Sequence, residues 1–511
     1  MQRRAFLQSL LAASFAARFP IAAFAADSDD TNDAPQRTTK AGMIRGHRSA
    51  DGVVYSFKGV PFAQPPVGPL RFRAPQPPLP WTDVREADRF GLAPMQSGKP
   101  ADQMSEDCLY LNVWTPTAPG PHPVFVWIHG GGNAGGWSGD SLADGSVFAR
   151  AGIVCVTLGY RLGAFGFLEL GELLGPNYAG SGNNGLRDLA AGLRWVHENI
   201  TAFGGDPAHV TLAGESAGAK DVAGLLAMPE VKGLVRQAIL ESGSGQTVHT
   251  LESAHDVAHR LRTAADIDSA ARLKDLPAAD ILAAQSRMSA DYPHAFPFRP
   301  VVDGHILPKR PVDAVAAGSA RNVSLIIGTN RDESLLFFSR DDASNPIGGR
   351  ELTNLSLDRM TSQTARYQQT FPAQSDLDRR IHQLTAEEYW IPSVRLAEAQ
   401  ARAGGMVRMY RFDRTAHSGN HAGYAVHASE LGYVWHDPAG ATDPAEHALA
   451  ALMHGAWIAF IATGNPQGLG LPDWPRYDTR ARRTLLFNDD GTAVIAEDPN
   501  GAERTLWDGV L

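Results

Sequence analysis

The feature that most constrains this chain is a short turn with a serine between two glycines. Residues 214–218 have the sequence Gly-Glu-Ser-Ala-Gly, with Ser216 at the centre. An apolar run at 210–213 precedes the turn and predicts a strand, and a helical pattern at 221–226 follows it. A side chain at either glycine would collide with the strand or the helix. A strand, sharp turn and helix around an exposed serine are typical of a nucleophile.

Apolar runs and helical patterns alternate along the rest of the chain. Further buried strands are predicted at residues 124–128, 153–158, 235–240, 323–327 and 406–412, the last of these as the last central strand. Apolar residues from Leu186 to Ile200 follow the spacing of an amphipathic helix. This alternation predicts an α/β fold with a mostly parallel central sheet flanked by helices.

Three other regions are expected to lie outside that alternation. Residues 41–114 are rich in proline and in alternating patterns, so we expect them to add antiparallel strands at one edge of the sheet. Residues 245–318 and 334–404 have helical patterns without a strong strand signal. We expect these two stretches to be helical insertions above the sheet that shape a substrate pocket.

A glycine run follows the strand predicted at 124–128. It comprises Gly130, Gly131 and Gly132, and Asn133 comes next. Acyl transfer builds negative charge on a carbonyl oxygen, which main-chain N–H groups can reach only where no side chain blocks the approach. The N–H groups of Gly131, Gly132 and Ala217 are therefore a candidate oxyanion hole. A phosphate-binding loop is disfavoured, because no Gly-Lys-Ser/Thr follows and the G-x-G-x-x-G spacing is incomplete.

A serine nucleophile needs a histidine as base and a carboxylate to orient that histidine, and both are expected later in the chain. Asp332 and Glu333 each qualify as the carboxylate by their position after the strand predicted at 323–327. Spacing alone does not choose the base among the histidines that follow residue 412, which are His417, His421, His427 and His436. A metal site is disfavoured, since these histidines have no H-x-x-x-H spacing on a clear helix and no cysteine nearby.

Two longer segments make the chain similar to the type-B carboxylesterase family, which includes bacterial p-nitrobenzyl esterases and the cholinesterases. Residues 203–218 resemble the family's serine signature, and residues 106–116 resemble its second signature. Shorter matching segments are 57–63, 182–186 and 463–466. The resemblance implies one α/β-hydrolase domain over residues 41–511 that hydrolyses a small-molecule ester without a cofactor.

The resemblance also selects among the candidate site residues. The family's acid matches Glu333, which leaves Asp332 as a surface residue, and residues 425–431 resemble the segment of the catalytic histidine, which selects His427. Glu215 resembles a family carboxylate near the active site. We expect it to stabilise the catalytic residues without contacting the substrate itself. Activity is expected to fall as the pH drops through the pKa of His427, at roughly 6–7.

The chain departs from the family in three respects. Many relatives pair the cysteine at position 108 with an upstream one, but residues 90–96 contain none. Residues 91–107 lack the tryptophan with which cholinesterases bind choline, so choline esters are not expected as substrates. Asn133 stands where an aromatic residue is common, which predicts a polar pocket that suits a bulky, polyfunctional ester.

The other cysteine, Cys155, lies in a predicted strand and is expected to be a buried structural thiol.

The N-terminal residues predict an export signal. Arg3 and Arg4 form a twin-arginine pattern, an apolar run follows at 10–24, and residues 23–25 offer a small-x-small cleavage site. Arg18 interrupts the apolar run, which is too short to cross a membrane core of roughly 30 Å. Residues 1–26 are therefore interpreted as a bacterial signal peptide and residues 27–40 as a disordered leader. The mature protein is expected to be periplasmic or secreted, without a stable membrane span.

Charge and chemistry narrow the remaining alternatives. The formal net charge is −9 and no basic run contains aromatic residues, so nucleic acid is not an expected partner. A lipase, amidase or transesterase would share the same three catalytic groups, and the sequence does not separate these activities. A non-catalytic binding protein on the same fold is disfavoured, because such relatives typically lose the nucleophile. Nothing in the sequence indicates an oligomeric state.

Overall fold

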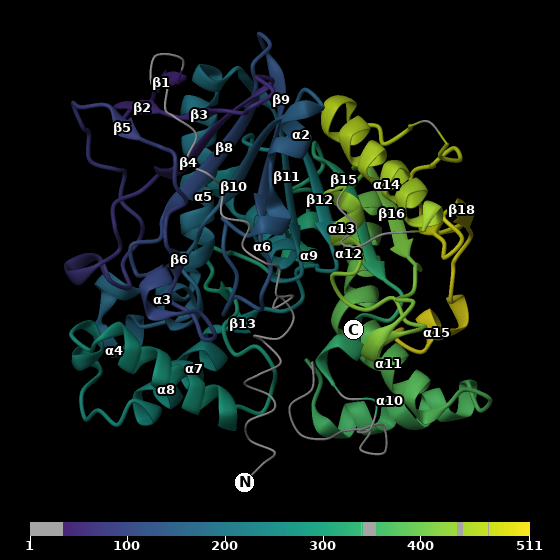
Figure 1. Ribbon diagram of the computed structural model, residues 1–511. Coiled ribbons are helices and arrows are strands. Elements are labelled where there is room, and N and C mark those ends of the chain that lie inside the picture. The colour runs from purple at the N-terminus through teal and green to yellow at the C-terminus, as the bar shows by residue number, and fades with distance from the viewer. Residues whose placement is uncertain (1–33, 339, 341–353, 437–442, 469) are drawn as a thin grey trace.

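An 11-stranded sheet runs through the centre of the molecule (Figure 1). The computed structural model describes residues 34–338, 340, 354–436, 443–468 and 470–511. In spatial order the strands are β18 (Ala493–Ala496), β17 (Thr484–Phe487), β16 (Val407–Phe412), β15 (Ser324–Asn330), β12 (Gln237–Glu241), β11 (Gly205–Glu215), β9 (His122–Ile128), β10 (Val154–Leu158), β8 (Tyr110–Pro116), β4 (Val54–Pro61) and β3 (His47–Arg48).

The sheet is parallel in its middle and antiparallel at both edges. Every pairing from β17 to β10 is parallel, whereas β8, β4 and β3 continue the sheet in antiparallel fashion. The prediction that residues 41–114 extend one edge is confirmed. The strand predicted at 406–412 forms β16, but the sheet continues beyond it, because β17 pairs with β16 and β18 pairs with β17 at the edge. These two strands have only four residues each, too few to establish a pattern in the sequence.

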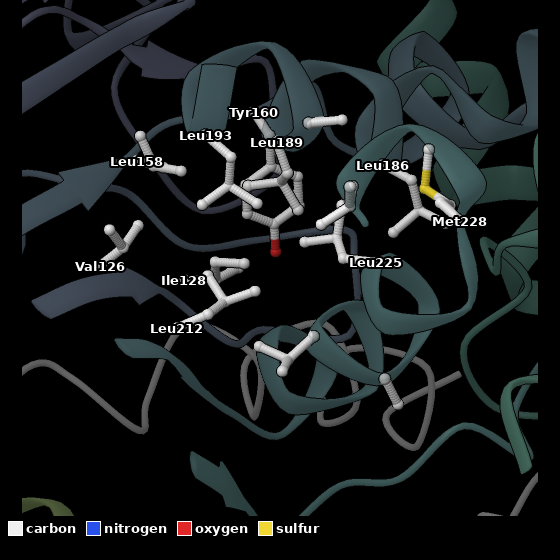
Figure 2. Close-up of a cluster of buried hydrophobic side chains, with 14 of the residues drawn as sticks. Val126, Ile128, Leu158, Tyr160, Leu186, Leu189, Leu193, Leu212, Leu225 and Met228 are labelled. Atoms are coloured by element: carbon white, nitrogen blue, oxygen red, sulfur yellow. The ribbon is translucent and has the colours of Figure 1, made fainter. Parts of the chain in front are cut away.

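Side chains alternate between the two faces of the sheet, and each face has its own hydrophobic core. In β9, Val126 and Ile128 point into one core, and Phe125 and Trp127 point into the other. Figure 2 shows part of the first core, where leucines of α5 (Asn184–Asn199) lie against strand residues such as Leu158 and Leu212. The predicted amphipathic helix is thereby confirmed, and burying each such leucine contributes about 1.5–3 kcal/mol.

Helices cover both faces of the sheet, as predicted. The first core is covered by α5, α6 (Ala217–Ala227), α9 (Pro311–Ala316) and α12 (Ile391–Arg402). The second core is covered by α2 (Ser146–Arg150), α13 (Leu431–Val434) and α14 (Pro444–Thr463). Helix α14 is long and apolar enough to cross a membrane, but residues such as Trp457 and Phe460 are fully buried in the second core, which makes it a core helix.

The two insertions lie at the same lower edge of the molecule in Figure 1, on opposite sides. The first contains α7 (Leu251–Ala264) and α8 (Ala278–Asp291), with a short sheet of β13 (His249–Thr250) and β14 (Val301–Val302). The second contains α10 (Leu357–Thr370) and α11 (Asp376–Thr385), followed by a π-helical turn at Ala386–Trp390. Helices α9 and α12 lie within the predicted insertions 245–318 and 334–404 but pack into the first core, so both insertions end earlier than expected.

The fold begins within the segment predicted to be a disordered leader. The proposed signal peptide and residues 27–33 lie outside the described residues, but β1 (Gln36–Thr38) pairs with β2 (Met43–Arg45), and β5 (Arg85–Glu86) completes this sheet. The leader prediction is therefore wrong for its last residues. The Lys40 N–H donates to the side chain of Asn199 (2.8 Å), so a contact far away in the sequence fixes this polar segment.

Short elements complete the chain: β6 (Ala93–Pro94), β7 (Met104–Ser105), α3 (Gly163–Phe167), α4 (Gly171–Leu174) and α15 (Gly501–Thr505). Cys108 and Cys155 are both buried and free, as expected for chains without the upstream cysteine.

Candidate active site

Ser216 lies on the turn between β11 and α6, in a backbone conformation that few side chains adopt. Its φ is 56° and its ψ is −122°, a strain that costs on the order of 1–3 kcal/mol. A Cβ at Gly218 would lie 2.3 Å from the carbonyl oxygen of Ile128, and one at Gly214 would lie 2.6 Å from the Gly218 carbonyl carbon. Both glycines are therefore required sterically, and the strand–turn–helix prediction is confirmed.

The glycine loop after β9 passes directly beside Ser216. A Cβ at Gly130 would lie 2.9 Å from the Ser216 Cβ. Gly132 and Ala217 line the same hollow as Ser216. Ala217 is the first residue of α6, so its N–H has no partner within the helix. Gly131 lies in this loop with a φ of 111°, and its carbonyl accepts the N–H groups of Ala134 and Gly135.

His427 and Glu333 come together from distant parts of the chain. Glu333 follows β15, and its Oε2 lies 2.6 Å from His427 Nδ1. Both side chains are buried. The other carboxylate oxygen of Glu333 accepts the Asn330 N–H (2.7 Å), which fixes the carboxylate from behind. Since a carboxylate only accepts, Nδ1 donates and the lone pair of neutral His427 is on Nε2, as a base requires.

Glu215, which precedes Ser216, lies closer to the reacting groups than expected. Its Oε1 is 3.1 Å from His427 Nε2, so the imidazole lies between two carboxylates. Burial alone would lower the pKa of His427, but Glu215 and then Glu333 outweigh burial and raise that pKa to about 9. Burial raises the pKa of Glu215 and the charge of His427 lowers it, so each of these two groups stabilises the charged form of the other. The expected histidine pKa of roughly 6–7 is therefore too low, because neighbouring charge dominates here.

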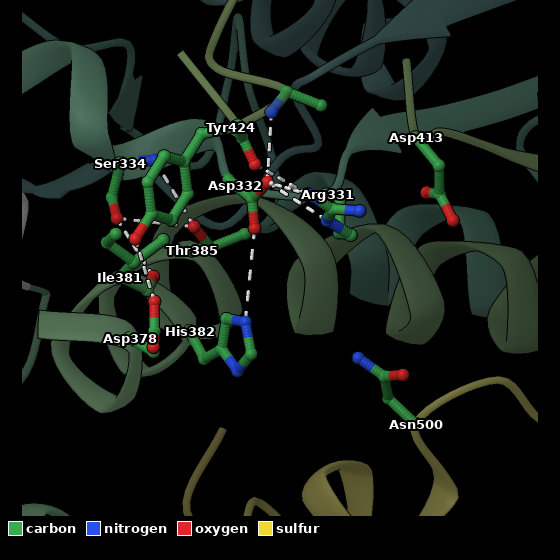
Figure 3. Close-up of polar contacts among 12 residues, drawn as sticks. Arg331, Asp332, Ser334, Asp378, Ile381, His382, Thr385, Asp413, Tyr424 and Asn500 are labelled. Carbon is green, nitrogen blue, oxygen red and sulfur yellow. Dashed lines mark hydrogen bonds and ion pairs between the residues drawn. The ribbon is translucent and has the colours of Figure 1, made fainter. Parts of the chain in front are cut away.

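Asp332 is buried, which makes its prediction as a surface residue wrong. Figure 3 shows its carboxylate pairing with Arg331. The same carboxylate accepts the Ala425 N–H at 2.9 Å. The Asp332 N–H donates in turn to the Ala425 carbonyl. These bonds hold the segment that leads to His427, so Asp332 positions His427 rather than pairing with it.

The other histidine candidates lie elsewhere. His417 and His436 are exposed, and the ring of His436 stacks on that of His454. His421 is half-buried, and burial lowers its pKa. Of the four candidates, His427 has the contact with Glu333.

Several residues around His427 were not predicted. Glu430 lies three residues further on, accepts from the Asn330 side chain at 2.5 Å, and has its pKa raised to about 7 by burial and by Glu333. The rings of Tyr389 and Phe337 lie 4.7 and 5.2 Å from the His427 ring and shield it from water. Tyr389 also lines the hollow beside Ser216, so the ring that packs on His427 forms part of the wall of that hollow. The sequence offered a signal only for Glu430, an acid in a segment otherwise apolar.

Comparisons with known proteins find one family over nearly the whole chain. Residues 33–507 match the model of the carboxylesterase family. The chain is 38% identical to the para-nitrobenzyl esterase of Bacillus subtilis, with 91% of this chain and 97% of that protein covered. It is 34% identical to the fumonisin B1 esterase of Sphingopyxis macrogoltabida, over 87% of this chain and 85% of that protein.

The chain also superposes on solved structures of carboxylesterases. A carboxylesterase of Geobacillus stearothermophilus superposes with a TM-score of 0.83 and 36% identity, over 92% of this chain and 99% of that one. The structure of a PNB esterase superposes with a TM-score of 0.82, also at 36% identity and over 92% and 99% of the two chains.

Proposed function

Because the chain belongs to the carboxylesterase family and is therefore a carboxylic ester hydrolase, we propose that Ser216, His427 and Glu333 are its catalytic triad. The observation that carries this assignment is the buried contact of 2.6 Å between His427 Nδ1 and Glu333 Oε2. Tyr389, whose ring lies 4.7 Å from the His427 ring, lines the same hollow as Ser216.

In the proposed reaction Ser216 Oγ attacks the ester carbonyl carbon while His427 Nε2 accepts the hydroxyl proton. Glu333 holds the imidazole and stabilises its protonated form. The proton then passes to the oxygen of the leaving alcohol, and an acyl-enzyme remains on Ser216. Water, deprotonated by His427, attacks this acyl-enzyme and releases the acid.

The oxyanion of both tetrahedral intermediates is proposed to lie against the N–H groups of Gly131, Gly132 and Ala217. Such fixed donors require no reorganisation as charge develops, and each contributes on the order of 10²–10³ to turnover. Glu215 is proposed to stabilise the protonated imidazole from the Nε2 side, since its carboxylate lies 3.1 Å away.

For the substrate, we propose a bulky, polyfunctional ester. Asn133 lines the hollow, and its side-chain Nδ2 donates a hydrogen bond to Asp221 Oδ1 (3.3 Å). This wall of the hollow is therefore polar. Two relatives are named a para-nitrobenzyl esterase and a fumonisin B1 esterase, and neither name refers to a plain aliphatic ester. Lipase, amidase and transesterase activity are alternatives that the same triad could support.

We further propose that residues 1–26 direct export of a single domain, residues 41–511, to the periplasm or the medium. The support is the sequence pattern around Arg3 and Arg4.

The function is tested with a panel of esters that vary in acyl length and alcohol bulk, together with matched amides and triglycerides. We expect bulky, polar esters to be hydrolysed fastest and the Ser216→Ala variant to be inactive on every compound. Faster hydrolysis of amides or long-chain triglycerides would favour the alternatives. A clear preference for plain aliphatic esters would contradict the proposed substrate class.

A further inference from the structure

The hollow beside Ser216 has two cationic side chains in its wall, and the proposed mechanism uses neither. Lys220 lies on α6, one turn after Ser216, and Arg299 lies just before β14. Phe296 and Phe298 line the hollow beside them. An ester group carries no charge, so it gives these two cations no partner. Because a buried charge is costly unless it is paired, each of the two side chains needs a partner of opposite charge.

Arg299 has no carboxylate partner in the described part of the chain. The residue is 8% exposed. Its Nε donates to the Phe296 carbonyl (2.8 Å), and its two terminal nitrogens donate to the Ala295 carbonyl and the Asn354 side-chain oxygen (2.9 Å each). All three acceptors are neutral. A guanidinium has five N–H donors, so two remain available for a ligand.

Lys220, by contrast, is already neutralised. Its Nζ pairs with Glu388, which also accepts from the Asn354 side chain at 2.6 Å. Glu387 is next to this pair. Burial followed by the charge of Glu388 raises the pKa of Glu387 well above its usual range, and the opposing charges of Arg299 and Lys220 do not reverse this rise, so the neutral form of Glu387 is favoured. Lys220 and Glu388 therefore cancel, and the charge of Arg299 is left unbalanced.

We propose that the substrate carries a free carboxylate that pairs with Arg299 while its ester carbonyl lies at Ser216. This inference rests on the proposed function. One unbalanced positive charge matches a single carboxylate better than a doubly charged phosphate, and the planar guanidinium fits a carboxylate in bidentate fashion. The phenylalanine rings that line the hollow suit a short hydrocarbon linker between the two groups.

The test compares esters that differ only in charge. For a carboxylate on the acyl side, monoethyl glutarate is compared with its primary amide, ethyl glutaramate. For the alcohol side, 4-acetoxybutanoate is compared with 4-acetoxybutanamide. In one of the two pairs we expect kcat/KM to favour the carboxylate by about tenfold or more, the usual worth of a charge-assisted hydrogen bond. The favoured pair identifies the side of the ester that carries the charge.

Three variants assign the preference to Arg299. Arg299→Met should reduce the ratio of the two kcat/KM values to about one, and Arg299→Lys should retain part of the preference. The matched control is Arg89→Met, the same change at a side chain that is 91% exposed, which should keep the wild-type ratio. Should Arg299→Met not fold, inhibition of the wild type is decisive: pentanoate should inhibit p-nitrophenyl acetate hydrolysis at a concentration about tenfold below that of pentanamide.

The outcomes separate the two proposals. Hydrolysis of p-nitrophenyl acetate with equal rates for charged and neutral partners in both pairs, or a preference that survives in folded Arg299→Met, would overturn the carboxylate site alone. Failure to hydrolyse any ester would overturn the proposed function itself.

Discussion

At the scale of single residues, the arrangement around His427 explains how one imidazole can serve as base and then as acid. The carboxylates of Glu333 and Glu215 lie 2.6 and 3.1 Å from its two nitrogens. In the proposed reaction, both stabilise the positive charge that appears on the ring once Ser216 has given up its proton. The same charges raise the pKa of the resting imidazole, so a smaller fraction of His427 is in the neutral form that acts as a base. The transition state, in which the ring is positively charged, is stabilised by the same two carboxylates.

Glu215→Gln tests this balance through the pH profile. The base acts in its neutral form, so kcat/KM should rise as the pH rises through the pKa of His427, which is raised to about 9 in the wild type. Removing one carboxylate lowers that pKa, so the rise should move toward acid by about 1–2 pH units. Its maximum should fall as well, because less charge stabilises the imidazolium. An unchanged profile, measured with the Ser216→Ala background subtracted, would show that Glu215 does not act on the base.

The role of a residue in the candidate site could be predicted from the sequence only where its immediate neighbours allow a single residue type. The turn at Ser216 excludes other residues by steric contact, so it was predictable. Asp332 and Glu333 are adjacent, and which of them meets His427 depends on the path of the backbone, so the choice came from the family resemblance alone. The buried position of Asp332 and the contact of Glu215 arise from packing between distant segments.

At the scale of elements, a buried ion pair joins the loop after β10 to helix α5. Arg161 donates from Nε and Nη2 to the two oxygens of Asp188, at 2.7 Å each, and the Arg161 main-chain N–H also donates to this carboxylate. Asp188 is fully buried. The pair therefore fixes α5 to the end of β10. Strand β10 pairs in turn with β9, the strand that leads into the glycine loop.

Asp188→Asn should destabilise the protein by about 3–5 kcal/mol, because it leaves the Arg161 charge buried without its counter-ion. Urea unfolding followed by circular dichroism measures this change. The matched control is Glu230→Gln, which breaks the exposed pair with Arg194 and should cost no more than about 1 kcal/mol. Equal losses in the two variants would mean that burial does not set the strength of the Arg161–Asp188 pair.

Long apolar elements were predictable, whereas short ones were not. The buried parallel strands and α5 have patterns long enough to identify their type. Strands β1, β17 and β18 have four residues or fewer and owe their structure to hydrogen bonds with neighbours. The limits of the second insertion were missed for a related reason, since α12 has a helical pattern whether it covers the sheet or not.

At the scale of the whole molecule, the parallel sheet brings residues far apart in the sequence to one edge. Ser216 follows β11 and Glu333 follows β15, and strands that run parallel end at the same edge. The insertions lie at one lower edge of the molecule in Figure 1, and residues from both, such as Arg299 and Tyr389, line the hollow beside Ser216. Their packing sets the shape of the hollow, which is why the sequence did not predict its lining.

The proposed export of the whole chain depends on the arginine pair near its start. Replacing both Arg3 and Arg4 by lysine preserves charge but removes the twin-arginine pattern, so esterase activity should remain in the cytoplasmic fraction of a bacterial host. Fractionation followed by an esterase assay measures the distribution, and Arg18→Lys is the control that should still be exported. Equal export of the double variant and the wild type would count against this pathway.

The central claim, that Ser216 is the nucleophile of a buried relay through His427 and Glu333, is tested most directly by labelling with a fluorophosphonate and mapping the modified peptide by mass spectrometry. We predict one adduct, on Ser216, in the wild type, none in Ser216→Ala, and labelling slowed by orders of magnitude in folded His427→Ala. An adduct on any other residue, or labelling that persists in Ser216→Ala, would contradict the account.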